Sequence, residues 1–218
     1  MTSIWLFIAI SFEIATFIVS VIYSKTLIKN KLSTFPYFLL FILLGEITGI
    51  LLGKIYHKNI AFYNIFTSLQ MAYYLVLIHK SINSLKGKRC ISFCLLFFII
   101  TTLINYFFIQ NIDAELASYT FTIGCLLITI GGVYFFYELL HSDEIENYAT
   151  YPQFWIILGL FIFYTCNIPY MSVYNYLSKN YLTICNAYFK IIEILSYIMY
   201  SFFIIGIVCN RKKKLFLH

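Results

Sequence analysis

The chain has 218 residues, of which 61% are hydrophobic and only 11% are charged, and its formal net charge is +6. A water-soluble domain of this size could not bury so much apolar side-chain surface. The composition therefore excludes a soluble globular protein and predicts an integral membrane protein. The basic residues flank the apolar segments, which indicates contact with anionic lipid headgroups and not with nucleic acid.

Seven apolar stretches are long enough to cross a bilayer, which takes about 20 residues of helix. They predict an all-α, polytopic membrane protein with a single transmembrane domain over residues 1–218. The first stretch lacks the basic start and cleavage site of a signal peptide, so we expect it to remain as a helix. The seven helices are expected over residues 3–23, 36–56, 60–80, 90–110, 117–140, 152–175 and 181–209.

The lysines and arginines are distributed unevenly between the two sides of the predicted membrane. They gather after the first helix (25–31), after the third (80–89) and in the C-terminal tail (211–214). Because basic loops stay in the cytoplasm, this pattern predicts an external N-terminus and a cytoplasmic C-terminus. The loop after the fifth helix is acidic and cytoplasmic in this topology. It is either a solvated turn or a docking point for a basic protein partner, through Asp143, Glu144 and Glu146.

The two halves of the chain resemble each other in sequence. Residues 34–38 (TFPYF) match residues 150–154 (TYPQF), and residues 61–65 (AFYNI) match residues 187–191 (AYFKI). In this alignment Lys190 corresponds to Asn64, and Glu193 to Thr67. The match predicts two parallel three-helix repeats, over 3–83 and 117–210, joined by a linking helix over 90–110.

This three-one-three layout is similar to that of the SWEET and PQ-loop transporters, and more distantly to that of the microbial rhodopsins. The local sequences YNIF at 63–66, YFFYELL at 134–140 and FW at 154–155 resemble an uncharacterised group of seven-helix membrane proteins of Bacteroidota. That resemblance implies a multi-pass protein of the bacterial inner membrane. It implies no particular activity.

Ionisable and amide side chains occur near the middle of several predicted helices. A charged group at the bilayer centre costs about 2.5–3.5 kcal/mol, so these groups are expected to turn inward and meet at one depth. Lys190 would pair with Glu46 or Glu193, and the remaining acids would be protonated or neutralised by a cation or a ligand amine. The cluster is either a ligand site or proton relay, or a structural lock between helices. Its candidate residues are Glu13, Glu46, Asn64, Gln70, Asn186, Lys190 and Glu193.

The second predicted helix carries Gly45, Gly49 and Gly53 at intervals of four residues. Small residues at this spacing let a neighbouring helix approach closely. We expect this face to pack helices together, either within the chain or between two copies of it.

No pattern of catalytic residues occurs in the chain. The sequence lacks H-E-x-x-H, G-x-S-x-G and G-x-G-D, so no catalytic residue and no enzyme activity are predicted. The six cysteines lie in or beside apolar stretches and are interpreted as small hydrophobes, so no metal and no cofactor are expected.

Two functional classes remain. The first is a small-solute or proton-coupled transporter with its site at the interface of the repeats. The second is a ligand-sensing receptor or regulatory subunit that acts on a cytoplasmic partner, such as a histidine kinase or a CRISPR effector.

Overall fold

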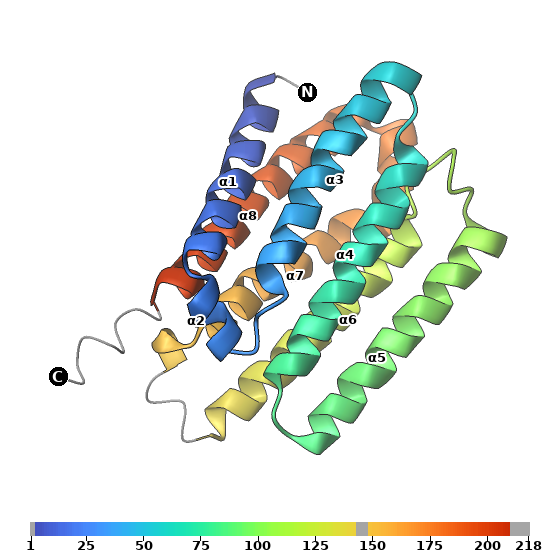
Figure 1. Ribbon diagram of the computed structural model, residues 1–218. Helices are drawn as coiled ribbons and strands as arrows, with labels where there is room; N and C mark the ends of the chain where they lie inside the picture. The colour runs from blue at the N-terminus through green and yellow to red at the C-terminus, as the bar shows by residue number, and fades with distance from the viewer. Residues whose placement is uncertain (1–2, 143–147, 210–218) are drawn as a thin grey trace.

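The computed structural model describes residues 3–142 and 148–209, and within these residues the regular structure is helical (Figure 1). Two helical elements were not expected from the sequence, the short α2 between the first two long helices and the π-helical turn η1 that ends α5. The elements are α1 (Ser3–Ile22), α2 (Ser24–Lys29), α3 (Phe35–Tyr56), α4 (Ile60–Ser81), α5 (Leu85–Ile104), η1 (Asn105–Ile109), α6 (Ser118–Leu140), α7 (Pro152–Asn180) and α8 (Leu182–Cys209).

Six of these helices are long and apolar enough to cross a membrane: α3, α4, α5 continued by η1, α6, α7 and α8. Residues Phe7–Ile22 of α1 form a shorter apolar helix. The prediction of a polytopic, all-helical membrane protein is therefore confirmed. The helix bounds differ most at the start of α5 and at the end of α7, by five residues each. α7 and α8 are 29 and 28 residues long and meet almost without a loop.

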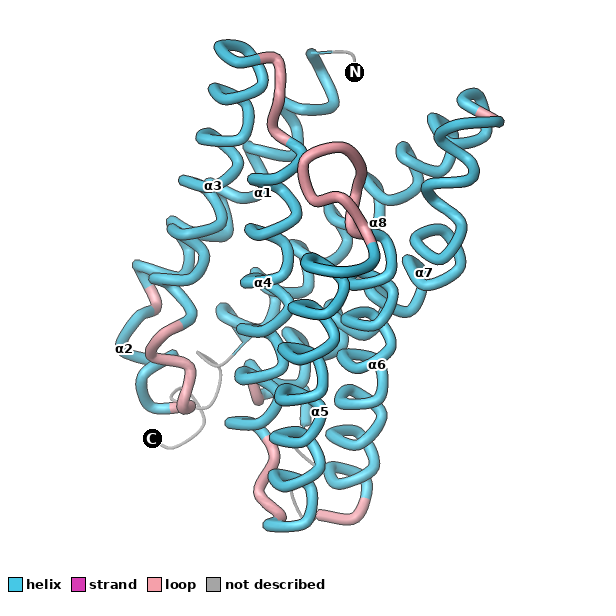
Figure 2. Tube along the Cα trace, turned by 90° about the vertical axis from the view of Figure 1, so that its right-hand side faces the viewer, coloured by secondary structure: helices cyan, strands magenta, loops and turns pink. Residues whose placement is uncertain are grey.

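The long helices alternate in direction and form a ring. α1 lies between α3 and α8, and α7 packs against both α6 and α8. α4 contacts α3, α5 and α6, so the ring closes through α4 while α5 lies against α4 and α6. Figure 2 shows α5 and α6 side by side, and Figure 1 shows that α1 begins and α8 ends at opposite ends of the bundle. The end at which α1 begins is called the upper end below, and the other the lower end.

The core of the ring consists of large buried side chains, contributed by helices far apart in the sequence. Phe35 of α3 packs edge-to-face on Phe203 of α8, with 5.5 Å between ring centroids. Tyr74 of α4 packs in the same way on Tyr164 of α7, at 5.7 Å. Such aromatic pairs stabilise the packing beyond the contribution of buried area.

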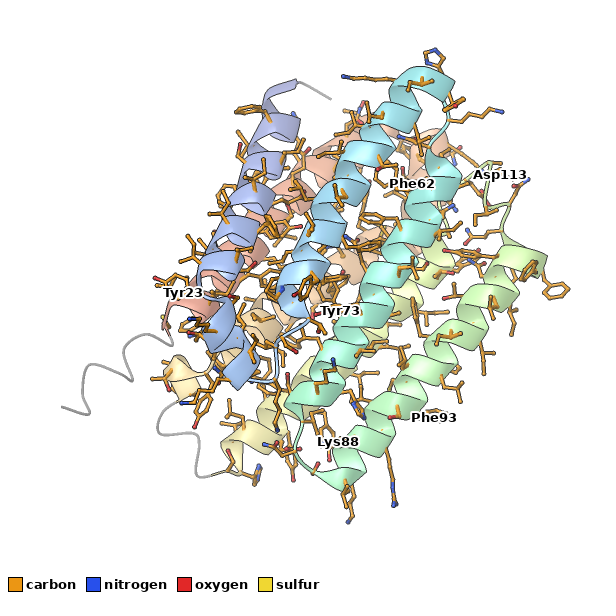
Figure 3. All side chains as sticks on the ribbon, viewed as in Figure 1. Tyr23, Phe62, Tyr73, Lys88, Phe93 and Asp113 are labelled. Carbon is orange, nitrogen blue, oxygen red and sulfur yellow. The ribbon has the colours of Figure 1, made fainter. Side chains whose placement is uncertain are left out.

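Seven of the eleven lysines and arginines in the described residues lie at the lower end. α1 ends there and leads into α2, α4 ends there, and α5 begins there, as the position of Lys88 in Figure 3 illustrates. The residues concerned are Lys25, Lys29, Lys31, Lys80, Lys86, Lys88 and Arg89.

The glycine face of α3 is turned towards α4 of the same chain. A Cβ atom on Gly45 would overlap the ring of Phe66, and one on Gly49 would lie 2.5 Å from Cζ of Tyr63. Any larger residue would therefore collide with an aromatic ring of α4. These glycines allow aromatic side chains to lie against the backbone of α3, which determines the position of Tyr63.

Candidate functional site

Glu13 is a carboxyl group buried in the middle of α1, with only 9% of its surface exposed. The hydroxyl of Tyr200 in α8 donates a hydrogen bond to its Oε1 at 3.2 Å. Its other oxygen, Oε2, has no hydrogen-bond partner among the described residues. The ring of Phe12 stacks on Tyr197 at 5.3 Å, one helical turn before Tyr200, and this contact sets the register of α1 against α8.

Glu46 of α3 faces the same region and is half-buried. The hydroxyl of Tyr63 in α4 donates to its Oε2 at 3.3 Å. Tyr63 can reach this position because Gly49 leaves room for its ring. Glu13 and Glu46 are close enough to interact electrostatically across the contact between α1 and α3. The structure therefore brings together two carboxyl groups and two tyrosine hydroxyls from four helices.

This carboxyl pair has no cationic partner among the described residues. The one ion pair found there joins Lys179 to Glu115 at 3.4 Å, in the connection at the upper end. A carboxylate in an apolar environment without a counter-ion is strongly unfavourable. The geometry is thus suited to binding a proton or a small cation.

Below the carboxyl pair the ring is filled by packed side chains. Ile42 lies one turn below Glu46, and Phe203 one turn below Tyr200, and both are fully buried. The ring of Tyr74 is also buried. This apolar layer separates the site from the lower end of the protein.

Lys190 lies at a different depth from the carboxyl pair. α1 and α8 run side by side in the same direction, and Glu13 is level with Tyr200. Lys190 is ten residues nearer the upper end, which corresponds to about 15 Å along the helix. Its side chain is exposed and forms no ion pair among the described residues. Asn186, one turn earlier on α8, is also exposed. α8 is longer than a membrane span, so the middle of its apolar stretch is a poor guide to depth.

Glu193 is buried, with 8% of its surface exposed, and its Oε1 has no hydrogen-bond partner in the described chain. It lies seven residues, or roughly 10 Å, above the level of Tyr200. Gln70 of α4 is half-buried. The acidic docking point expected at Asp143, Glu144 and Glu146 lies outside the described residues.

Asn64 has a structural position at the upper end. It is 2% exposed, and its Nδ2 donates to the carbonyls of Ile112 and Glu115 at 2.9 and 3.0 Å. Its Oδ1 accepts from the backbone N–H of Ala117 at 2.9 Å. One side chain therefore holds the connection between η1 and α6 against α4, away from the carboxyl pair.

Sequence reasoning did not identify Tyr63 and Tyr200 as site residues. Both lie on the polar faces of their helices, but tyrosine is common on packing faces, and 20 tyrosines occur in the chain. A second polar cluster was also missed, in which Asn105 Nδ2 donates to Gln110 Oε1 and Thr120 Oγ1, each at 2.9 Å. These partners come together only because η1 interrupts the end of α5.

No protein-family model matches the chain, and no curated protein or solved structure matches it either. Within residues 3–142 and 148–209, no three His, Cys, Asp or Glu side chains group closely enough to hold a metal ion. The chain is thus characterised as an integral, multi-pass membrane protein with buried polar residues.

Proposed function

We propose that the protein is a proton-coupled transporter of a small solute, and that Glu13 and Glu46 bind the coupling proton. The observation that carries this proposal is the position of the two carboxyls on adjoining helices, Glu13 buried and Glu46 half-buried, with no ion pair to a cation among the described residues. Ionising both carboxyl groups costs free energy, because the two negative charges repel each other away from water, and a shared proton removes that repulsion. Gain and loss of that proton would then change the forces between α1 and α3.

The proposed topology places the upper end outside the cell and the lower end in the cytoplasm, in the inner membrane of a bacterium. The basic residues at the lower end support it, because basic loops remain cytoplasmic. The apolar layer of Ile42, Tyr74 and Phe203 supports closure towards the cytoplasm. In this proposal the carboxyl pair loads from outside, and the layer opens when the two three-helix halves move against each other.

The test uses the purified full-length protein in liposomes that contain a trapped pH-sensitive dye. A panel of amino acids, sugars and amines is added outside, and the internal pH is followed. Wild-type protein is expected to move protons with at least one solute. Glu13→Gln and Glu46→Gln keep the side-chain shape but cannot release a proton, so each is expected to reduce coupled proton movement at least tenfold.

Glu115→Gln is the matched control, since it removes an acid that lies in the upper connection and not in the carboxyl pair. It is expected to retain wild-type proton movement, and circular dichroism in detergent confirms the folding of all three variants. Undiminished proton movement by both Glu13→Gln and Glu46→Gln would contradict the site. Wild-type liposomes that move no protons with any solute would contradict transport and favour the receptor class.

A further inference from the structure

A polar cavity of about 200 Å³ lies at the lower end, apart from the carboxyl pair. It is bounded by the segment that follows α1, the end of α4, the end of α6 and the start of α7. Three lysines line it, Lys29, Lys31 and Lys80. They come from segments about 50 residues apart in the sequence, so the tertiary fold and not the local sequence concentrates positive charge here.

The lysines of this pocket are not neutralised by carboxylates of the described chain, because none of them forms an ion pair there. Glu138 also lines the cavity, but both of its oxygens are already bonded. Oε1 accepts from the backbone N–H groups of Asn83 and Ser84 at 2.6 and 3.1 Å, and Oε2 accepts from Ser84 Oγ at 2.7 Å. Its charge is thus directed at the start of α5, so the described residues that line the pocket carry an excess of positive charge.

Gln153, a residue that lines the pocket, has an unused hydrogen-bond acceptor. Gln153 of α7 donates through Nε2 to the carbonyl of Asn30. Its Oε1 is buried and has no partner among the described residues. A ligand that satisfies both features carries an anionic group for the lysines and a hydroxyl donor for the amide oxygen.

We propose that this pocket binds a hydroxylated phosphate ester at the cytoplasmic end of the protein. The ammonium groups of Lys29, Lys31 and Lys80 contact the phosphate. The side chain of Gln153 turns towards the cavity on binding, so that its Oε1, buried in the unbound pocket, accepts from a hydroxyl of the ester. Two sources share this chemistry, the headgroup of an anionic lipid such as phosphatidylglycerol and a soluble ester such as glycerol 3-phosphate. Basic pockets between transmembrane helices at this face are suited to such headgroups.

The test measures lipid binding to the detergent-purified full-length protein by native mass spectrometry during titration with phosphatidylglycerol. Wild type is expected to retain one lipid. The triple variant Lys29→Gln, Lys31→Gln, Lys80→Gln is expected to bind on the order of 100-fold more weakly, because each lysine near a headgroup contributes about a fivefold factor. Replacing Lys86, Lys88 and Arg89 by Gln removes the same charge at the same end but outside the pocket, and should leave binding within about threefold of wild type.

Two ligand comparisons complete the experiment. Phosphatidylmethanol has the same charge without the hydroxyls and is expected to bind at least tenfold more weakly than phosphatidylglycerol. Displacement of the lipid by millimolar glycerol 3-phosphate identifies a soluble ester as the ligand, and its failure to displace identifies the lipid. Equal weakening in the two triple variants, equal binding of the two lipids, or no retained ligand of either kind would overturn the proposal.

Discussion

Replacement of Asn64 by leucine tests whether this buried amide is a structural residue. The two side chains are similar in volume, so the change creates no large cavity, but it removes three hydrogen bonds. The carbonyls of Ile112 and Glu115 are half-buried and can turn partly to water, at a cost of about 1 kcal/mol each. The N–H of Ala117 is buried and costs about 2 kcal/mol when unpaired. The expected loss of unfolding free energy is therefore about 4 kcal/mol.

The measurement is unfolding of the purified protein in mixed micelles with increasing dodecyl sulfate, together with hydrogen exchange of residues 110–117. Asn186→Leu is the control, since Asn186 is exposed on α8 and its replacement should change the unfolding free energy by less than about 0.5 kcal/mol. Backbone amides at 110–117 should exchange faster in Asn64→Leu only. Equal stability of the two variants, or unchanged exchange in that segment, would refute the assigned role.

Two further substitutions test the packing of the helices. Gly49→Ala should destabilise the protein by about 1–3 kcal/mol in the same unfolding assay. The new methyl group would displace the ring of Tyr63 and break its hydrogen bond to Glu46. An unchanged unfolding free energy would contradict the packing of Tyr63 against Gly49. Glu138→Gln should cost about 1.5–3 kcal/mol and accelerate hydrogen exchange at the start of α5, because an amide has one acceptor oxygen where the carboxylate uses two to hold Ser84 and its neighbour. Hydrogen exchange at the start of α5 that stays at the wild-type rate would contradict this role of Glu138.

The sequence determined the approximate bounds of the apolar helices. Of the seven stretches expected to cross the membrane, six are long and apolar enough within the described residues, and the first forms the shorter apolar helix of α1. The stretches expected at 36–56, 60–80 and 117–140 agree with α3, α4 and α6 to within about one residue. This agreement arises because a helix that crosses the membrane needs about 20 apolar residues, so the ends of an apolar stretch lie close to the ends of the helix. α5 begins five residues earlier than expected, since Ser84 caps it and its basic first turns remain helical in water.

The inward orientation of Glu13 and Glu46 was also predictable, because a charge facing lipid is too costly. The hydrogen-bond partners of these two carboxyls were not predictable from the sequence. Tyr200 binds Glu13 across 187 residues of sequence, and this contact exists only because α8 closes the ring against α1.

The depth of each residue was likewise decided by the tertiary structure. Helical periodicity assigns Lys190 and Tyr200 to related faces, but it does not encode how far α8 slides along α1. The stacking of Phe12 on Tyr197 sets that register and leaves Lys190 far from the carboxyl pair. Local sequence thus determines which residues form helices and which avoid lipid, whereas side-chain packing between distant helices determines which polar groups meet.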